Sequence, residues 1–192
     1  MQSRIEIPCA HCGAEGSLTM LALSSEIPYF GEHTQITILC DDCGWKHTDF
    51  IPSEGMKPGY WSIELDSIDK LISRVVRSSS CTIRIPQLDL EVTPGGSSSG
   101  FISNIEGVIN RFENVVGTII RGTSDSDELI RKANQILEDL DIAKSGQSDF
   151  HIVLLDPRGR SQIIHDEAES RELTKEELAE LDTGPDLPVF SN

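Results

Sequence analysis

Much of the chain alternates apolar and polar residues with a period of two, which is the pattern of a strand that buries one face. β-Branched residues are frequent in these runs, as strands prefer. The alternation predicts a mainly antiparallel β-protein. The runs lie at residues 18–23, 34–40, 60–65, 71–78, 81–86 and 88–92, and two more flank a turn, DPRG, within residues 150–166.

Between the last two groups of strands, apolar residues recur every three or four positions, and this spacing predicts two helices. Ser103 and Glu106 are placed as a capping box for the first helix, and Asp125 is placed to cap the second. The connection at residues 121–126 is short, so we expect an antiparallel helical hairpin. The apolar stripes are Ile102, Ile105, Ile109, Phe112, Val116 and Ile119 in the first helix, and Leu129, Ala133, Ile136, Leu137 and Leu140 in the second.

This hairpin is predicted to be an insertion in the β-domain at about residues 101–145, because strand-like sequence resumes after it. The first helix also carries Val108, Val115 and Ile120 outside its main stripe. That is more apolar width than packing against one partner helix needs. We therefore expect Val108 and Val115 to face a binding partner.

Glycine and proline mark the remaining boundaries. Four of them between positions 52 and 59 predict a division into residues 1–52 and residues 53–192. The segment TPGGSSSG at 93–100 lacks the G-K-[ST] ending of a phosphate-binding loop, so we interpret it as a flexible hinge, with weak anion binding as the alternative. Near the end of the chain, Thr174 and Glu177 form a second capping-box pattern, which predicts one short acidic helix.

Two CxxC pairs, CAHCG and CDDCG, carry the clearest chemistry in the sequence. Each is followed by a glycine, whose tolerance of positive φ lets the turn aim backbone N–H groups at thiolates. A redox CxxC usually precedes a helix that lowers the thiol pKa, and neither pair has that setting. Two such turns offer four soft ligands to tetrahedral Zn²⁺ and leave no open position for catalysis. The predicted ligands of this closed, structural zinc site are Cys9, Cys12, Cys40 and Cys43.

The other cysteine and the histidines form no catalytic pattern. Cys81 heads a strand and is interpreted as an ordinary buried thiol. His151 and His165 lie in strands with no motif around them, and we find no pairing of a nucleophile with a general base, which argues against an enzyme. Three histidines that could replace a cysteine ligand are expected at the surface instead: His11, His33 and His47.

Charge and hydropathy argue against two further classes of protein, nucleic-acid binders and membrane proteins. Asp and Glu number 32 against 16 Lys and Arg, for a net charge of −16. Nucleic-acid binding depends on clustered cations, so direct contact with a duplex is disfavoured. A solubilising surface, a basic protein partner and a salt-rich cytosol each account for the acidity. No apolar run is long enough to cross a membrane and the first residues lack a signal-peptide core, so a cytoplasmic protein is expected, of undetermined oligomeric state.

Large apolar side chains are concentrated in the segment SSEIPYFGEH, which is predicted as a loop between two strands. Two explanations stay open at this stage. The side chains either pack over the small core of the zinc module or form a docking surface, since aromatic residues are enriched in interfaces. The residues concerned are Ile27, Pro28, Tyr29 and Phe30.

Several stretches between about residues 7 and 166 are shared, in this order, with one family: CAHCG, IPYF, LCDDCG, RVVRSSSCTIRIPQLDLEV, IEGVINR and LLDPRGRSQI. Together they resemble the ZPR-type zinc-finger family. The resemblance implies a mainly β fold with α: a four-cysteine zinc ribbon followed by an antiparallel β-domain, sandwich-like or double-stranded β-helix-like, with an inserted helical hairpin. It also implies that the four cysteines of the CxxC pairs bind zinc, and that IPYF and the hairpin face a partner.

The same resemblance implies a function. Eukaryotic members of that family carry two such modules in tandem and associate with translation elongation factor one-alpha, for which they act as a folding or assembly chaperone. This chain holds one module and looks like the single-module archaeal form. The expected function is therefore a zinc-binding protein-interaction module that assists a GTPase of this type. Two alternatives remain. One is a zinc-ribbon protein that binds nucleic acid or is associated with transcription, and the other is an enzyme whose site has no recognisable motif.

Overall fold

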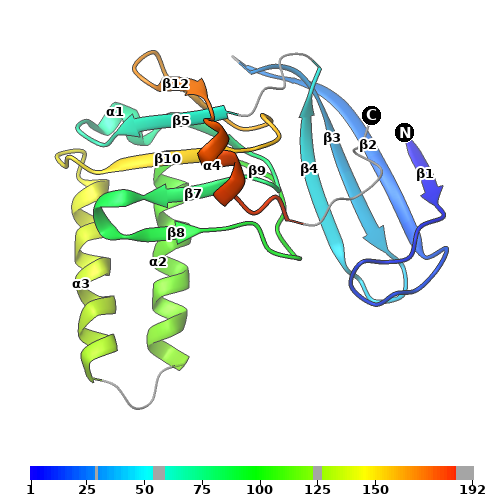
Figure 1. Cartoon of the computed structure of the whole chain (residues 1–192), viewed down its shortest axis with the longest axis horizontal. Helices are drawn as coiled ribbons and strands as arrows, with labels where there is room; N and C mark the ends of the chain where they lie inside the picture. The colour runs from blue at the N-terminus through cyan, green and yellow to red at the C-terminus, as the bar shows by residue number, and fades with distance from the viewer. Residues whose placement is uncertain (29, 54–58, 123–126, 185–192) are drawn as a thin grey trace.

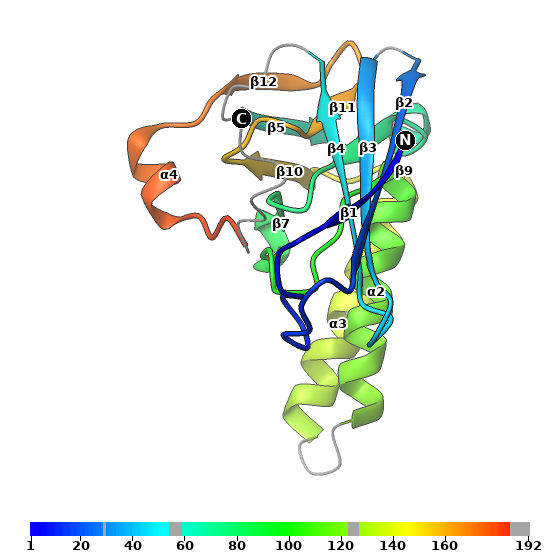
Figure 2. The same ribbon diagram turned by 90° about the vertical axis from the view of Figure 1, so that its right-hand side faces the viewer.

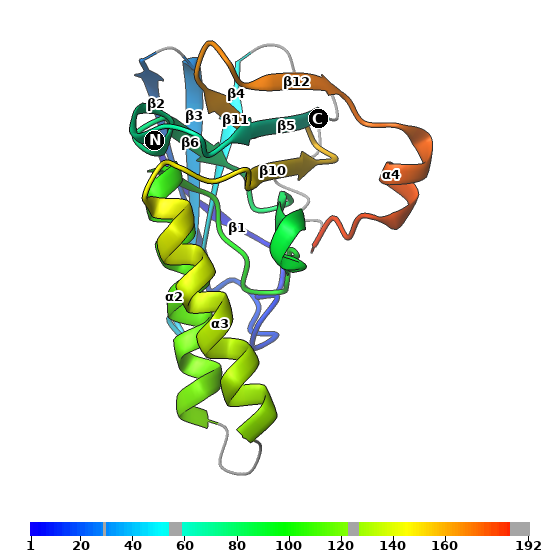
Figure 3. The ribbon, with the colours of Figure 1, turned by 90° about the vertical axis from the view of Figure 1, so that its left-hand side faces the viewer.

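Three antiparallel sheets and a pair of long helices organise the part of the chain that the structure describes (Figure 1). The structure is a computed structural model, and it describes residues 1–28, 30–53, 59–122 and 127–184. The first sheet stands beside the other two (Figure 1), and the pair of long helices extends beyond the lower edge of those two sheets (Figures 2 and 3).

The first sheet has the strand order β1-β2-β3-β4, and both CxxC pairs lie in or next to its loops. Pairing of β2 with β3 is continuous from Leu18↔Cys40 to Ile27↔Gly31. The segment predicted as a long loop is therefore mostly strand, and that prediction was wrong: polar residues such as Ser24 and Thr34 pair across the two strands. The strands are β1 (Gln2–Ile5), β2 (Leu18–Ile27), β3 (Gly31–Cys40) and β4 (Lys46–Pro52).

The other two sheets have the orders β12-β5-β10-β7-β8 and β11-β6-β9. The five-stranded sheet contains β5 (Gly59–Glu64), β7 (Thr82–Ile85), β8 (Leu90–Val92), β10 (His151–Asp156) and β12 (Glu169–Glu172). The three-stranded sheet contains β6 (Arg74–Arg77), β9 (Phe101–Asn104) and β11 (Gln162–Ile164). A short helix, α1 (Ile68–Leu71), and a 3₁₀ turn (Pro86–Leu88) connect strands.

One apolar core joins these two sheets and the helices. Burial of branched aliphatic side chains on facing layers is the main stabilising contribution to such a domain. Ile85 and Leu154 come from the five-stranded sheet, Val75 and Ile163 from the three-stranded sheet, and all four are fully or almost fully buried. The helices contribute Ile105, Ile109 and Leu140 to the same cluster.

The two strands around the turn DPRG do not form a hairpin. β10 ends at Asp156 in the five-stranded sheet, and β11 begins at Gln162 in the three-stranded sheet. The turn itself is present, because the amide of Gly159 donates to the carbonyl of Asp156 at 3.1 Å. The prediction of two strands and a turn was correct, but the chain crosses from one sheet to the other at this point.

The long helices are α2 (Ile105–Gly122) and α3 (Asp127–Lys144), and both lie between β9 and β10 in the chain. The first begins later than the apolar spacing predicted, since Ile102 belongs to β9 and is exposed. Its cap is Asn104 rather than Ser103: the amide of Gly107 donates to Asn104 Oδ1 at 2.8 Å. The predicted second cap, Asp125, lies outside the described residues.

The capping box predicted near the C-terminus is confirmed at α4 (Lys175–Glu180). The Thr174 hydroxyl accepts from the amide of Glu177, whose carboxylate accepts from the amide of Thr174.

The segment 93–100, predicted as a flexible hinge, is instead anchored by hydrogen bonds. The amide of Gly100 donates to the carbonyl of Thr48 at 2.7 Å, and Ser98 and Ser99 both accept from Arg77.

Candidate metal centre and buried polar junction

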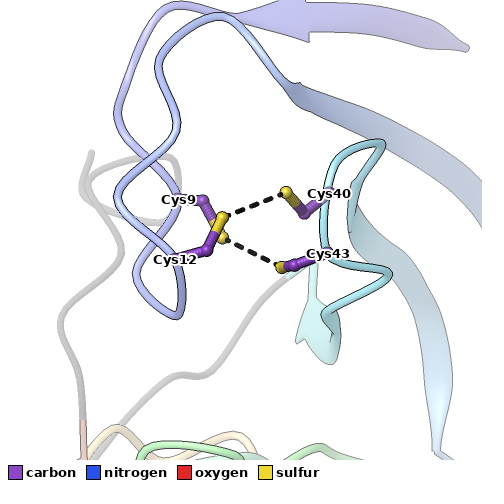
Figure 4. A group of neighbouring side chains, drawn as sticks. All are labelled: Cys9, Cys12, Cys40 and Cys43. Carbon is purple, nitrogen blue, oxygen red and sulfur yellow. Dashed lines mark hydrogen bonds between the residues drawn. The ribbon is translucent and has the colours of Figure 1, made fainter.

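Four thiols meet at the end of the first sheet (Figure 4). The Sγ atoms of Cys9 and Cys43 lie 3.9 Å apart, those of Cys12 and Cys40 lie 3.8 Å apart, and all four lie within 4.8 Å of one another. Four sulfurs held at about 2.3 Å from a central Zn²⁺ in a tetrahedron are about 3.8 Å from each other. The donor set and its spacing therefore fit a zinc ion.

Two matching turns position these thiols. The amide of Gly13 donates to the carbonyl of Cys9 at 2.8 Å, and the amide of Gly44 donates to that of Cys40 at 3.0 Å. Both glycines adopt positive φ, +75° and +73°, as the sequence predicted. An L-residue with a side chain is strained in this conformation, so glycine is the residue that lets each turn close behind its thiol.

The thiols are electrostatically unequal when no cation is present. The Ser17 hydroxyl, 3.3 Å from Cys40 Sγ, lowers the pKa of Cys40 to about 6. The Trp45 amide favours the Cys43 thiolate, but burial and hydrogen bonds with the other three thiols prevail and raise the pKa of Cys43 to about 12. Four thiolates this close repel one another, and a divalent cation removes that repulsion.

The three neighbouring histidines do not join the thiols. His11 is exposed, as expected, but His33 and His47 are 3% and 2% exposed, so the prediction that they lie at the surface was wrong. The His33 ring packs against those of Phe30 and Phe50, with centroids 6.2 and 5.8 Å away. His47 stacks on Trp45, and burial lowers the pKa of His47. Both rings serve as core side chains.

A buried polar junction, which no sequence motif indicated, connects the first sheet to the rest of the chain. Asp49, on β4, is fully buried. Its Oδ1 accepts from the amide of Ser79 at 2.9 Å, and its Oδ2 accepts from the Ser79 hydroxyl at 2.9 Å and from Arg160 Nη1 at 3.1 Å. A carboxylate can be buried only when its charge is compensated in this way.

Asp156 forms the second half of the buried polar junction. This fully buried carboxylate, at the end of β10, accepts from three hydroxyls, those of Ser78, Ser80 and Ser161, at 2.6 to 2.8 Å. It also accepts from the amides of Arg158 and Arg160. The stretches SSSC and DPRGRS, far apart in sequence, are thus two sides of one hydrogen-bonded cluster.

Of the residues expected to contact a partner, some are buried in the core and others are exposed. Ile27 and Val108 are 5% and 1% exposed and belong to the core, so neither side chain is available to a partner in this structure. Phe30 is half-buried, while Pro28 and Val115 are exposed. Tyr29 lies outside the described residues.

The fifth cysteine, Cys81, is fully buried as predicted, and burial raises the pKa of its thiol to about 12. Among the described helices, none is both long and apolar enough to span a membrane.

Comparison with known proteins gives two adjacent matches. Residues 3–58 match the family model of the ZPR1 zinc-finger domain, and residues 69–182 match that of the ZPR1 jelly-roll domain. A jelly roll is a double-sheet β fold, so the expectation of a sandwich-like β-domain after a zinc ribbon is confirmed.

Relatives of similar length occur in archaea. A ZPR1-like protein of Methanocaldococcus jannaschii is 35% identical over 96% of this chain and 92% of its own length. A second, from Pyrococcus horikoshii, is 34% identical over 94% of this chain and 82% of its own length. A more distant relative in Schizosaccharomyces pombe is named zinc finger chaperone; it is 26% identical over 81% of this chain but only 34% of its own length.

Proposed function

Because the chain belongs to the ZPR1 zinc-finger family, we propose that it is a zinc-stabilised folding or assembly chaperone, and that its client is a GTPase of the translation elongation factor one-alpha type. The observation that carries the proposal is the match of both family domains over nearly the whole chain, together with the chaperone name of the yeast relative. On this proposal the protein acts in the cytoplasm, where translation factors fold, and it catalyses no reaction.

Zinc has a structural role in this proposal. The ligands are Cys9, Cys12, Cys40 and Cys43, whose four sulfurs complete a tetrahedron and leave no position for a substrate. The metal joins the β1–β2 and β3–β4 loops, since each loop supplies two of the four thiols. Zinc binding and folding of this end of the sheet are therefore coupled.

We also propose the division into a zinc ribbon at residues 1–52 and a β-domain at residues 53–192. Sheet membership supports it, because the first sheet ends with β4 at Pro52 and the next sheet begins with β5 at Gly59. The buried polar junction, through Asp49 and Arg160, then acts as the fixed connection between the two parts.

Partner contact is proposed at the β2–β3 turn and along α2. Pro28 is exposed and Phe30 is half-buried at that turn, and Val115 is 53% exposed on α2. On this proposal the side chains belong to exposed apolar patches, which are the surfaces that protein partners typically cover. Ile27 and Val108 support these two places from beneath rather than by contact.

Co-elution on a sizing column tests the proposal. The purified zinc-loaded chain is mixed with elongation factor one-alpha of the same organism, with GDP and separately with a non-hydrolysable GTP analogue. A complex in at least one nucleotide state is expected. Absence of a complex in both states, with both proteins folded, contradicts the proposed client.

A pair of variants tests the proposed contact site. Tyr29→Ala combined with Phe30→Ala is expected to weaken the complex. Ile72→Ser, a matched control, removes an apolar side chain that is 69% exposed next to α1 and should leave binding unchanged. Zinc content and the unfolding curve of each variant are measured first, so that loss of binding is separated from loss of fold.

A further inference from the structure

A groove lies where α2 packs beside β7, β8 and β9, and it encloses about 480 Å³. Its walls are mostly apolar: Ile83, Val92, Phe101, Phe112 and Val115 all line it. Val92 and Val115 expose 37% and 53% of their surface there. A cavity of this size with apolar walls and few polar groups is typical of a binding site.

The charge of the groove is opposite to that of the chain. Among the residues that the structure describes, two arginines line it, Arg77 and Arg111, and no carboxylate does. Their guanidinium carbons lie 5.8 and 4.0 Å from the centroid of the Phe101 ring. Because acidic residues outnumber basic residues 32 to 16 over the whole sequence, an all-cationic lining is a local reversal of charge.

The two arginines differ in what they can offer a ligand. Arg77 is buried and already donates to the carbonyls of Cys81 and Ser99 and to the Ser98 hydroxyl. Arg111 is exposed and, within the described part of the chain, forms neither an ion pair nor a hydrogen bond. Its contact is the face of Phe101, which leaves the guanidinium donors directed to solvent.

Nearby carboxylates are engaged elsewhere. Glu91, next to Val92 in sequence, pairs with Arg84, and Glu113 on α2 pairs with Lys144 of α3. An incoming carboxylate therefore does not have to displace an internal one to reach Arg111. The groove combines an apolar pocket with an unengaged cation at its edge.

We infer that the groove along α2 binds an extended segment of the client protein, one that offers a large apolar side chain with a carboxylate one or two residues away. The apolar side chain enters between Val92, Phe101 and Val115, and the carboxylate pairs with Arg111. The inference rests on the proposed function for the identity of the client. A second copy of this chain is opposed as the occupant by its own charge of −16.

The first arm of the test needs no client. The probe is 8-anilinonaphthalene-1-sulfonate, a dye that joins an apolar aromatic body to one anionic group, titrated by fluorescence into the folded, zinc-loaded chain. Two charge reversals on the same helix are compared, Arg111→Glu and Arg121→Glu. The first should weaken dye binding by roughly tenfold, and the second should leave it within about twofold.

A second matched pair of variants tests the apolar wall of the groove. Val115 and Ile119 are both 53% exposed on α2, but only Val115 lines the groove. Val115→Ser should weaken dye binding, whereas Ile119→Ser should not. If Arg111→Glu binds the dye as tightly as Arg121→Glu does, the groove is not an anion-accepting site and the inference is overturned, whatever the client does.

The second arm adds elongation factor one-alpha to the dye-loaded chain. Displacement of the dye, together with weaker co-elution of Arg111→Glu than of Arg121→Glu, supports the inference. If the factor binds both variants equally and leaves the dye in place, the groove inference fails while the proposed function stands. If the factor does not bind the unchanged chain at all, the proposed function fails, and with it the client as occupant, while the dye arm still decides the chemistry of the groove.

Discussion

Arg160 Nη1 lies 3.1 Å from Asp49 Oδ2, although 111 residues separate the two along the chain. Both side chains are buried, at 7% and 0% exposure. Asp49 belongs to β4 of the zinc-bearing sheet, and Arg160 follows the turn after β10 of the five-stranded sheet. This ion pair therefore specifies how the two parts of the molecule fit together.

Removal of one partner of this pair is expected to be costly. Asp49→Ala removes a buried acceptor that Arg160 Nη1 shares with both Ser79 donors, and we expect a loss of about 3–5 kcal/mol in the free energy of unfolding. Urea denaturation of the zinc-loaded protein measures it. The control is Arg4→Ala, which removes the exposed Arg4–Asp41 pair and should cost about 1 kcal/mol or less. Equal losses in the two variants would contradict a specifying role for the buried pair.

Asp156 is predicted to be the other sensitive position of the buried polar junction. In Asp156→Asn an amide nitrogen replaces one of two oxygens that together accept from five donors. An amide cannot accept on that side, so at least two donors lose their acceptor, and we expect a loss of about 3 kcal/mol or more. Ser80→Ala removes a single donor and should cost only about 1–2 kcal/mol. The prediction fails if the two variants unfold at the same urea concentration.

Zinc content should distinguish two buried cysteines. Cys40→Ser removes one of the four thiols and is expected to abolish stoichiometric zinc and to destabilise the first sheet. Cys81→Ser changes a fully buried thiol far from the others, and it should retain one zinc per chain. Metal analysis of both purified variants checks the prediction, and full zinc in Cys40→Ser would refute the proposed ligand set.

Thiol counting gives an independent measurement on the unchanged protein. After a chelator removes zinc, the loops that carry Cys9, Cys12, Cys40 and Cys43 should open, and these four thiols should then react with a thiol reagent near pH 8. The fifth, Cys81, should react only after the whole chain unfolds, because it is fully buried in the core between the two other sheets and the helices. Reaction of all five thiols in the folded, zinc-free chain would be inconsistent with this assignment.

The start of α2 gives a test of which residue caps the helix. Asn104→Ala removes the acceptor of the Gly107 amide, and we expect a loss of about 1 kcal/mol. Ser103→Ala is the matched control, because the sequence pattern assigned the cap to Ser103 and the structure places it in β9. A larger loss for Ser103→Ala than for Asn104→Ala would reverse this assignment.

The zinc turns and most strands could be predicted from the sequence because their causes are local. A thiol pair followed by Gly13 or Gly44 contains in five residues everything that shapes its turn. Alternation likewise identified the strands around Ile63 and Ile83. The strands β1, β4, β9 and β12 were missed. The residues of β1 and β12 carry no apolar alternation, and β9 was assigned to the start of the first helix.

The buried polar junction could not be predicted in this way, because its partners are brought together by the fold. Asp49 has the same local sequence signature as a surface aspartate, and only pairing of the sheets places Ser79 and Arg160 beside it. The stretches SSSC and DPRGRS were recognisable as family features, but their physical role depends on contacts across 76 to 83 residues. Burial of His33 and His47 was missed for the same reason.

The last prediction concerns acid pH and the C-terminal helix α4. Arg171 makes two hydrogen bonds of 2.7 Å to the Glu177 carboxylate, and this pairing lowers the pKa of Glu177 from 4.5 to about 2. A carboxylate with a lowered folded pKa stabilises the protein above its unfolded pKa, and the contribution is lost as the pH falls through the folded value. Glu177→Gln should therefore lower Tm at pH 7 by roughly 2–4 °C, as expected for about 1 kcal/mol in a chain of this size.

The difference in Tm between this variant and the unchanged chain should narrow by pH 4 and approach zero near pH 2, because glutamine does not titrate and Glu177 becomes protonated. Zinc is lost from both proteins as the thiols are protonated, so that effect cancels in the comparison. Thermal unfolding from pH 7 to pH 2 measures the difference. A gap that stays constant over this range would mean that the charge of Glu177 does not supply the difference between the two proteins.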